Sequence, residues 1–289
     1  MRKRKMWGIL LLFLLQAAFG ACSHGDGYEL ERLIAGNDRT VKKDVYLNGE
    51  NVGGLKESEL LAKIEGYAAE IDIEPQNASL DSSTWEVTKE KEGRKVDVEE
   101  TLRLVLDADE GEKVDLVVEK KKPTVTAEDL ESRLVVIGKY TTPLLDRSQS
   151  RMNNIQLASE KIDCKKLGPG EEFSFNKVVG RRTEAKGYEE APIIIKIEGK
   201  PKKDYAVGGG ICQLSTTIYN AIEECGLEVL ERHIHSKDVG YVPHGEDATV
   251  SYGSADLRFR NNRAYPIMIR VYQGEKALTV KIIENRNTA

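Results

Sequence analysis

Three consecutive glycines, Gly208, Gly209 and Gly210, constrain the fold more than any other feature of this sequence. Glycine is unfavourable inside helices and strands, so the run cannot continue either element, and it lets the backbone pass close to packed protein or to a ligand. Gly226, further along, is a typical helix stop signal. Between them lies an apolar helical face formed by Leu214, Ile218, Ala221, Ile222 and Cys225. We therefore expect a helix that begins directly after the glycines.

Cys212 lies at the start of this expected helix, where the helix dipole favours a thiolate. His233 and His235 follow on a predicted strand, and their spacing of two puts both side chains on one face. One of the two histidines is then a candidate base for Cys212, with Asp247 to orient it, and we choose His235 for this role. The equal alternative is that Cys212 is a small buried residue that closes a Gly-rich turn.

The first 21 residues predict export. Arg2 to Lys5 are basic, and the apolar run at 6–18 is shorter than the roughly 20 residues that a membrane-spanning helix needs. Phe19-Gly20-Ala21-Cys22 resembles the lipobox of bacterial lipoproteins, in which the signal is cut before the Cys and the thiol carries a lipid. We expect a signal at 1–21, a tether at 22–42 and an anchor through Cys22 on the outer face of the membrane. The alternative is an ordinary cleaved signal followed by a chance Cys.

The composition excludes some classes of function. The chain has 43 Lys and Arg against 48 Asp and Glu residues, a net charge of −5, and removing the four basic residues of the signal leaves −9. Such an acidic chain is a poor ligand for phosphate backbones, so we expect no nucleic-acid partner. Cys164, Cys212 and Cys225 form an odd, sparse set that is not a disulfide framework, although one bridge could form.

Residues 43–122 predict a small α+β domain. Asn48-Gly49 is a hairpin signal, helices are expected at 58–71, with Ser58 as N-cap, and near 98–106, and a strand is expected at 114–118. The segments 47–49, 52–55 and 96–97 resemble the peptidoglycan-binding domain often found ahead of VanW domains. The resemblance implies wall binding, and the alternative is a structural spacer.

A dense series of short motifs marks the C-terminal part. They lie at 169–176, 180–184, 187–188, 208–217, 231–236, 241–243, 245–250, 256–257 and 261. Together they resemble the VanW domain family, whose members are mostly exported bacterial envelope proteins. We therefore expect an α+β chain of two small domains, with a VanW-like domain at 137–289 of mixed short strands around one main helix. A psi-barrel-like arrangement is one form that this domain could take.

Carboxylates in Gly-bounded loops give the leading functional hypothesis. Glu184 lies between Arg182 and Tyr188, and Asp247 lies in another tight loop. A lytic transglycosylase cleaves glycan strands with one protein acid/base, because a hydroxyl of the substrate attacks. Glu184 would be that group, with Asp247 as second candidate. The alternatives are an ion pair for Glu184 and an Asx-type turn for Asp247.

Two other functions stay open: Cys212 chemistry on peptide stems, and a non-catalytic wall-binding scaffold. The resemblance to wall-acting proteins makes peptidoglycan the expected partner in each case. No cofactor is expected, and no metal, because the His, Cys and Asp residues lack the close spacing of a zinc site. Polar groups and glycines near the expected helix are candidate substrate contacts: Arg182, Tyr188, Gly209, Gly210, Gln213, Ser215 and Thr216.

Overall fold

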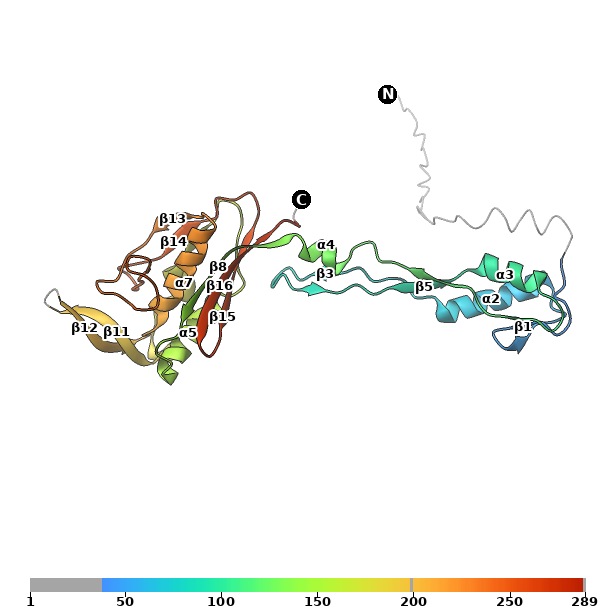
Figure 1. Cartoon of the computed structure of the whole chain (residues 1–289), viewed down its shortest axis with the longest axis horizontal. Helices are drawn as coiled ribbons and strands as arrows, with labels where there is room; N and C mark the ends of the chain where they lie inside the picture. Colours follow the sequence, from blue (N-terminus) through green and yellow to red (C-terminus); the bar gives the residue numbers. More distant parts are fainter. Residues whose placement is uncertain (1–37, 198–199, 288–289) are drawn as a thin grey trace, which may run out of the picture. The chain divides into compact units, whose positions relative to one another are not determined.

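The computed structural model describes residues 38–197 and 200–287 (Figure 1). The predicted signal, Cys22 and most of the predicted tether lie outside this range. The described chain forms two compact units. The first contains the residues up to Glu74 together with Arg94–Lys120, and the second contains Pro75–Gly93 and the residues from Lys121 onward.

The first unit joins a small sheet to two helices. Its elements are β1 (Tyr46–Leu47), β2 (Glu50–Asn51), α2 (Glu57–Ile71), β5 (Gly93–Val96), α3 (Val98–Asp107), β6 (Lys113–Val114) and β7 (Val118–Lys121). β1 pairs antiparallel with β2 and parallel with β6. The turn between β1 and β2 has positive φ at both Asn48 (51°) and Gly49 (84°), which confirms the predicted hairpin. Leu47, Leu60, Ile64 and Val105 are fully buried in its core.

Both predicted helices of this unit form, but one predicted cap is wrong. Helix α2 begins after Lys56, whose backbone N–H donates to Glu59, so Ser58 is inside the helix. Helix α3 begins after Asp97, whose carboxylate accepts from the N–H of Glu100 at 2.9 Å. The single strand predicted at 114–118 is two short strands, β6 and β7, which belong to different sheets.

Residues 75–93 belong to the second unit, whereas the sequence placed them inside a continuous first domain. They carry β3 (Ser79–Leu80) and β4 (Val87–Thr88), which pack on α4 (Ala127–Glu131). The Asn77 side chain accepts from the N–H groups of Thr124 and Val125, and Glu90 accepts from the N–H of Ala127. These long-range hydrogen bonds join residues 75–93 to the part of the chain that follows the first unit.

A four-stranded antiparallel sheet is the framework of the second unit. Its strands, in order, are β8 (Leu134–Pro143), β16 (Ala277–Asn285), β15 (Ile267–Gln273) and β9 (Lys165–Leu167). Helices α5 (Gln149–Ile162) and α7 (Ile211–Glu224) pack against this sheet and against each other (Figure 1). The predicted helix after the glycines is α7. Helix α5 was not predicted, so the domain has two main helices and not one.

Shorter elements complete this unit. They are β10 (Glu172–Ser174), α6 (Phe175–Val179), the 3₁₀ helix η1 (Glu184–Lys186), the hairpin β11 (Glu190–Ile197) and β12 (Lys200–Val207), β13 (Glu228–Glu231) and β14 (Arg258–Arg260). β14 pairs with both β10 and β13, and Phe173 stacks on Phe259 with ring centroids 4.9 Å apart. The described sheets are separate and open, so the α+β class is confirmed and the psi-barrel arrangement is wrong. Within the described residues, the helices are too short or too polar to cross a bilayer.

Candidate functional site

The glycine run serves close packing at the entrance to α7. A Cβ on Gly209 would lie 2.4 Å from the Ala191 carbonyl oxygen, and one on Gly210 would lie 2.8 Å from Cγ of Arg151. Gly208 and Gly210 also have φ of 89° and 106°, which disfavours residues with a Cβ. Of the two roles that the sequence left open, close approach to packed protein is the one that these contacts show.

Cys212 is the second residue of α7 and is partly exposed. Its Sγ lies 3.5 Å from Thr249 Oγ1 and 3.5 Å from the Val250 carbonyl oxygen. The N–H groups in the first turn of a helix have no acceptor within the helix, and the helix dipole is positive at this end. The thiol therefore lies where negative charge is stabilised.

His235 and Asp247 complete a three-residue chain that ends at this thiol. Asp247 Oδ2 accepts two hydrogen bonds of 2.6 Å, one from the His235 backbone N–H and one from Nδ1 of its ring. Because Nδ1 is occupied, Nε2 is the ring nitrogen left to interact with the Cys212 thiol, with which His235 is electrostatically coupled. The His235 and Asp247 side chains are only 12% and 9% exposed, so solvent screens this contact weakly.

The electrostatics match a thiolate–imidazolium pair. Burial raises the pKa of the Cys212 thiol, but the hydrogen bond and charge of His235 lower it by more, to about 7. Burial lowers the pKa of His235, and its contacts with Cys212 and Asp247 raise it above the usual value. Each partner thus favours the charged form of the other.

The loop that carries Asp247 is fixed by side chains on two elements. Arg232, next to the end of β13, donates from Nε to the Asp247 carbonyl oxygen at 2.9 Å and from a second nitrogen to the Gly245 carbonyl. It also bonds to the Tyr219 hydroxyl at 2.8 Å and lies 4.0 Å from the centroid of that ring. From α7, Asn220 donates to the Glu246 carbonyl oxygen at 2.8 Å. These contacts hold the carboxylate against His235.

An open cleft of about 780 Å³ gives access to Cys212 and His235. Its other lining residues come from the glycine turn, helices α5 and α7, the base of the β11–β12 hairpin and three loops. They include Arg151, Arg181, Arg182, Gly209, Gly210, Gln213, Tyr241 and Tyr252. The cleft is large enough for a short peptide or a sugar.

The structure brings together three of the four predicted catalytic residues. Cys212, His235 and Asp247 meet, whereas Glu184 is exposed on η1 and does not line the cleft. Asp247 is already the acceptor for His235, so it fits the predicted orienting role better than that of a free acid. His233 takes no part in the contacts between Cys212, His235 and Asp247, because its exposed ring bonds to Glu231.

Several predicted substrate contacts have other positions. Tyr188 is a core residue with 3% exposure. The buried hydroxyls of Ser215 and Thr216 bond to the backbone of Ala248, which positions the residue after Asp247. The predicted role of these three side chains in substrate contact therefore does not fit the structure. The cleft is lined instead by Arg182, Gly209, Gly210 and Gln213 from the predicted set.

Sequence reasoning missed several residues of the cleft, among them Arg151 and Tyr241. Arg151 lies on α5, a helix that was not predicted, so no local signal pointed to it. Tyr241 lies in one of the VanW-like motifs and bonds to Thr216; burial and the charge of Cys212 raise its pKa above the usual range. The motif gave a signal for Tyr241, but nothing connected it with Cys212.

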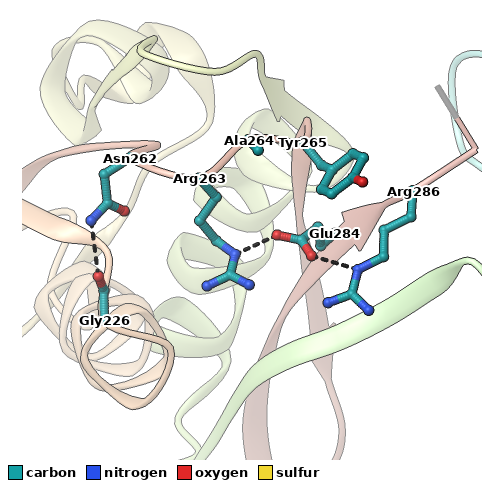
Figure 2. A pocket seen from close by; sticks show the side chains of 7 residues that line it. All are labelled: Gly226, Asn262, Arg263, Ala264, Tyr265, Glu284 and Arg286. Carbon is teal, nitrogen blue, oxygen red and sulfur yellow. Dashed lines mark hydrogen bonds and ion pairs between the residues drawn. The ribbon is translucent and has the colours of Figure 1, made fainter. Parts of the chain in front are cut away.

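A second depression, of about 480 Å³, lies beside the end of β16. Figure 2 shows Arg263 and Arg286 turned toward the Glu284 carboxylate between them, and Asn262 bonded to the Gly226 carbonyl. Glu284 is 2% exposed and bonds to both guanidinium groups. These charges are satisfied internally, so the depression is a structural ion-pair network.

The described residues give less support to a disulfide or to a metal site. Cys164, Cys212 and Cys225 are all free, so the disulfide that the sequence allowed does not form there. No group of three or more His, Cys, Asp or Glu side chains in 38–197 and 200–287 has the arrangement of a metal site. His244, which the sequence offered as a further ligand type, bonds to Asp238 at the surface.

Comparison with known proteins assigns both parts of the chain. Residues 150–283 match the family described as "VanW like protein", and residues 41–116 match the family described as "Putative peptidoglycan binding domain". The "Uncharacterized protein YoaR" of Bacillus subtilis (strain 168) is 46% identical over 146 residues, which are 50% of this chain and 47% of that protein. The "Vancomycin B-type resistance protein VanW" of Enterococcus faecalis (strain ATCC 700802 / V583) is 27% identical over 119 residues, 39% of this chain and 42% of that protein.

The chain thus spans about half or less of the length of these curated relatives. No solved structure gives a significant match. The two resemblances inferred from the motifs are confirmed: this chain carries a VanW-like domain, preceded by a domain similar to the peptidoglycan-binding family.

Proposed function

We propose that this protein is a cell-envelope thiol enzyme that acts on the peptide part of peptidoglycan, with Cys212 as nucleophile. The observation that carries the proposal is the chain of contacts from Asp247 through His235 to a thiol at a helix N-terminus. Nucleophile, base and orienting carboxylate in this order are the parts that thiol catalysis needs. All three lie in the VanW-like domain.

The chemical steps follow from the positions of these groups. The Cys212 thiolate attacks an amide carbonyl carbon, and the carbonyl oxygen takes the negative charge near the first-turn N–H groups of α7. As the C–N bond breaks, the His235 imidazolium gives its Nε2 proton to the leaving amine. The resulting thioester is then opened by water, which gives a peptidase, or by an amine, which gives a transferase. Asp247 keeps the His235 ring oriented and stabilises its charged form.

Glycan cleavage has weaker support. The exposed position of Glu184 gives it no access to the cleft, and Asp247 is engaged by His235. A general acid must reach the glycosidic oxygen within hydrogen-bond distance, usually in a site that restricts water. Thiol chemistry on peptide stems is therefore the mechanism that the site favours, and the lytic-transglycosylase mechanism becomes one outcome of the test.

The expected location also belongs to the proposal. The match of residues 41–116 to a peptidoglycan-binding family supports an extracytoplasmic place for the chain, and the lipobox-like segment before Cys22 supports a lipid anchor on the outer face of the membrane. A Cys22→Ser chain should be recovered from the medium and not from the membrane fraction. Equal membrane recovery of both chains would argue against the lipid anchor.

Muropeptide analysis tests the proposed activity. Purified mature protein is incubated with intact peptidoglycan, and the products are separated and identified by mass spectrometry. We expect new stem-peptide ends or new peptide cross-links with wild type and Glu184→Gln, and none with Cys212→Ala or His235→Ala. Cys225→Ser, which changes a thiol outside the site, is the matched control and should keep activity.

Two results would contradict the thiol mechanism. Anhydro-muropeptides that persist in Cys212→Ala and disappear in Glu184→Gln would support glycan cleavage instead. An unchanged muropeptide profile with all variants, together with co-sedimentation of the protein with the wall, would support a non-catalytic binder.

A further inference from the structure

The cleft beside Cys212 is positively charged, although the protein as a whole is acidic. Arg151, Arg181 and Arg182 line it, while Asp146 is the single acidic residue among the described residues of the lining. The chain carries a net charge of −5. Local excess of one sign against the overall charge is typical of a surface that attracts a ligand of the opposite charge.

Arg151 is held in place but incompletely bonded. Its Nη2 donates to Gln213 Oε1 at 3.0 Å, and its aliphatic part packs where a Cβ of Gly210 would lie. Its buried Nε has no hydrogen-bond acceptor in the described structure. A buried donor without an acceptor is costly, so it calls for a partner that binds from the cleft.

Arg182 is a half-buried cation whose hydrogen bonds go only to neutral groups. Its Nη1 donates to Asn176 Oδ1 at 2.7 Å and to the Gly180 carbonyl oxygen at 3.1 Å, and the guanidinium lies 5.6 Å from the centroid of the Phe175 ring. No carboxylate of a described residue forms an ion pair with it. Cations that are partly withdrawn from water are normally paired, and the charges that act on Arg182 are first the Cys212 thiolate and, less strongly, Asp256, with which it forms no ion pair.

The second depression of the same unit provides a contrast. There, Arg263 and Arg286 share the buried carboxylate of Glu284 (Figure 2). The cleft contains guanidinium groups of the same kind, but within the described structure Arg151, Arg181 and Arg182 have no such carboxylate. The fold therefore supplies an ion-paired carboxylate where the charge network is structural, whereas no described carboxylate is ion-paired to the three arginines beside the nucleophile.

We infer that Arg151, Arg181 and Arg182 form a carboxylate-binding subsite, so that the substrate is a peptide with a free carboxylate close to the amide that Cys212 attacks. This inference rests on the proposed thiol activity. A carboxylate next to a thiolate would otherwise be repelled, and the guanidinium groups offset that repulsion. Guanidinium binds carboxylate with two parallel hydrogen bonds, which would also fix the position of the scissile carbonyl.

Alkylation of Cys212 with two small reagents tests the subsite without turnover. Iodoacetate carries a carboxylate and iodoacetamide is its neutral counterpart, and both transfer their carbon to the thiolate with release of iodide. Site-resolved mass spectrometry gives the ratio of the two rates at Cys212, and 2-mercaptoethanol gives the reference ratio for a free neutral thiol. We expect a ratio at Cys212 well above the reference, by about tenfold, the effect of one charge-assisted hydrogen bond.

Substitutions separate the effect of the arginines on this rate ratio from the effect of the His235 charge. Arg151→Gln and the exposed Arg181→Gln should each lower the ratio several-fold. Arg182→Lys keeps the half-buried charge but loses the paired donors, and it should lower the ratio less. Lys161→Gln is the matched control, because it removes an exposed charge from the same helix as Arg151 outside the cleft, and it should leave the ratio unchanged.

A ratio equal to the reference, a ratio unaffected by all three arginine substitutions, or a Cys212 inert to both reagents would overturn the inference. A high, arginine-dependent ratio in a protein that cuts no stem peptide would leave the subsite standing and reject the proposed activity. Cleavage of stem peptides without an arginine-dependent ratio would do the reverse. The two proposals can therefore fail separately.

Discussion

Replacing Asp247 by Asn removes one charge from the site and almost none of its shape. The carboxylate is 9% exposed and accepts two 2.6 Å hydrogen bonds through one oxygen, from the backbone and from the ring of His235. The oxygen of Asn accepts both bonds equally well. Only the interaction between the negative charge and the His235 imidazolium is lost.

The expected shift follows from the difference between charged and neutral hydrogen bonds. A bond to a charged group contributes about 1.5–3 kcal/mol and a neutral one about 0.5–1.5 kcal/mol, so the change removes about 1–1.5 kcal/mol from the imidazolium form. That is about one pKa unit. A weaker imidazolium stabilises the thiolate less, so the pKa of Cys212 should rise from about 7 toward about 8. At pH 6 the thiolate fraction should then fall about tenfold.

The pH dependence of Cys212 alkylation by iodoacetamide measures this shift, because only the thiolate reacts. The midpoint should move to higher pH in Asp247→Asn. Asp238→Asn is the matched control, because it makes the same change in an exposed His–Asp pair, Asp238 with His244. An unmoved midpoint in Asp247→Asn, or an equal shift in the control, would refute the role given to the buried carboxylate.

Three further outcomes test how the site is supported. Gly209→Ala should lower the free energy of unfolding by about 1–3 kcal/mol, because its Cβ would lie 2.4 Å from the Ala191 carbonyl oxygen; urea unfolding followed by Trp85 fluorescence measures it. Arg232→Met should cost about 2–3 kcal/mol by the same measurement and lower the rate of Cys212 alkylation at pH 6, because the bonds to the Gly245 and Asp247 carbonyls are lost. Asp97→Ala should cost about 1 kcal/mol in the first unit through loss of the α3 cap, seen by circular dichroism with Trp85 fluorescence unchanged.

Local patterns in the sequence predicted local structure well. The Asn48-Gly49 turn and the helix after the glycines follow from properties of single residues and from short-range spacing, and both formed where expected. The capping box of α4, in which Thr126 and Asp129 bond to each other's backbone, is a local feature of the same kind. Such features need no knowledge of distant contacts.

The predictions that failed concern segments whose contact partners lie far away in the sequence. Helix α5 has a weak apolar pattern, because Asn154 and Ser159 are among its buried residues, and Asn154 bonds to the backbone of Glu189 and Gly209. The excursion at 75–93 is placed by bonds to residues beyond the first unit, which no local signal reveals.

The candidate site contains residues that the sequence could predict and residues that it could not. Cys212, His235 and Asp247 could be proposed from residue type and position, because the helix dipole, the two histidines and loop chemistry each point to one member. The predicted strand under the histidines is wrong, because β13 ends at Glu231 and His235 lies in the loop that follows. Choosing between Glu184 and Cys212 required knowing which side chains face the cleft, and that depends on the tertiary fold. Arg151 was hidden for the same reason, since it meets the predicted contact Arg182 in the cleft only through long-range packing.

The position of β16 in the sheet has a consequence for biogenesis. This strand, at Ala277–Asn285, lies between β8 and β15, and its register with β8 joins residues about 140 positions apart. Helices α5 and α7 of the second unit both pack on this sheet, so α7 lacks part of its support until the strand is in place. During secretion the thiol centre should therefore mature only after residue 285 has emerged, and a chain that stops before Ala277 would expose two unpaired strand edges. On the proposed function, the thiol site would therefore be incomplete while the chain is being exported.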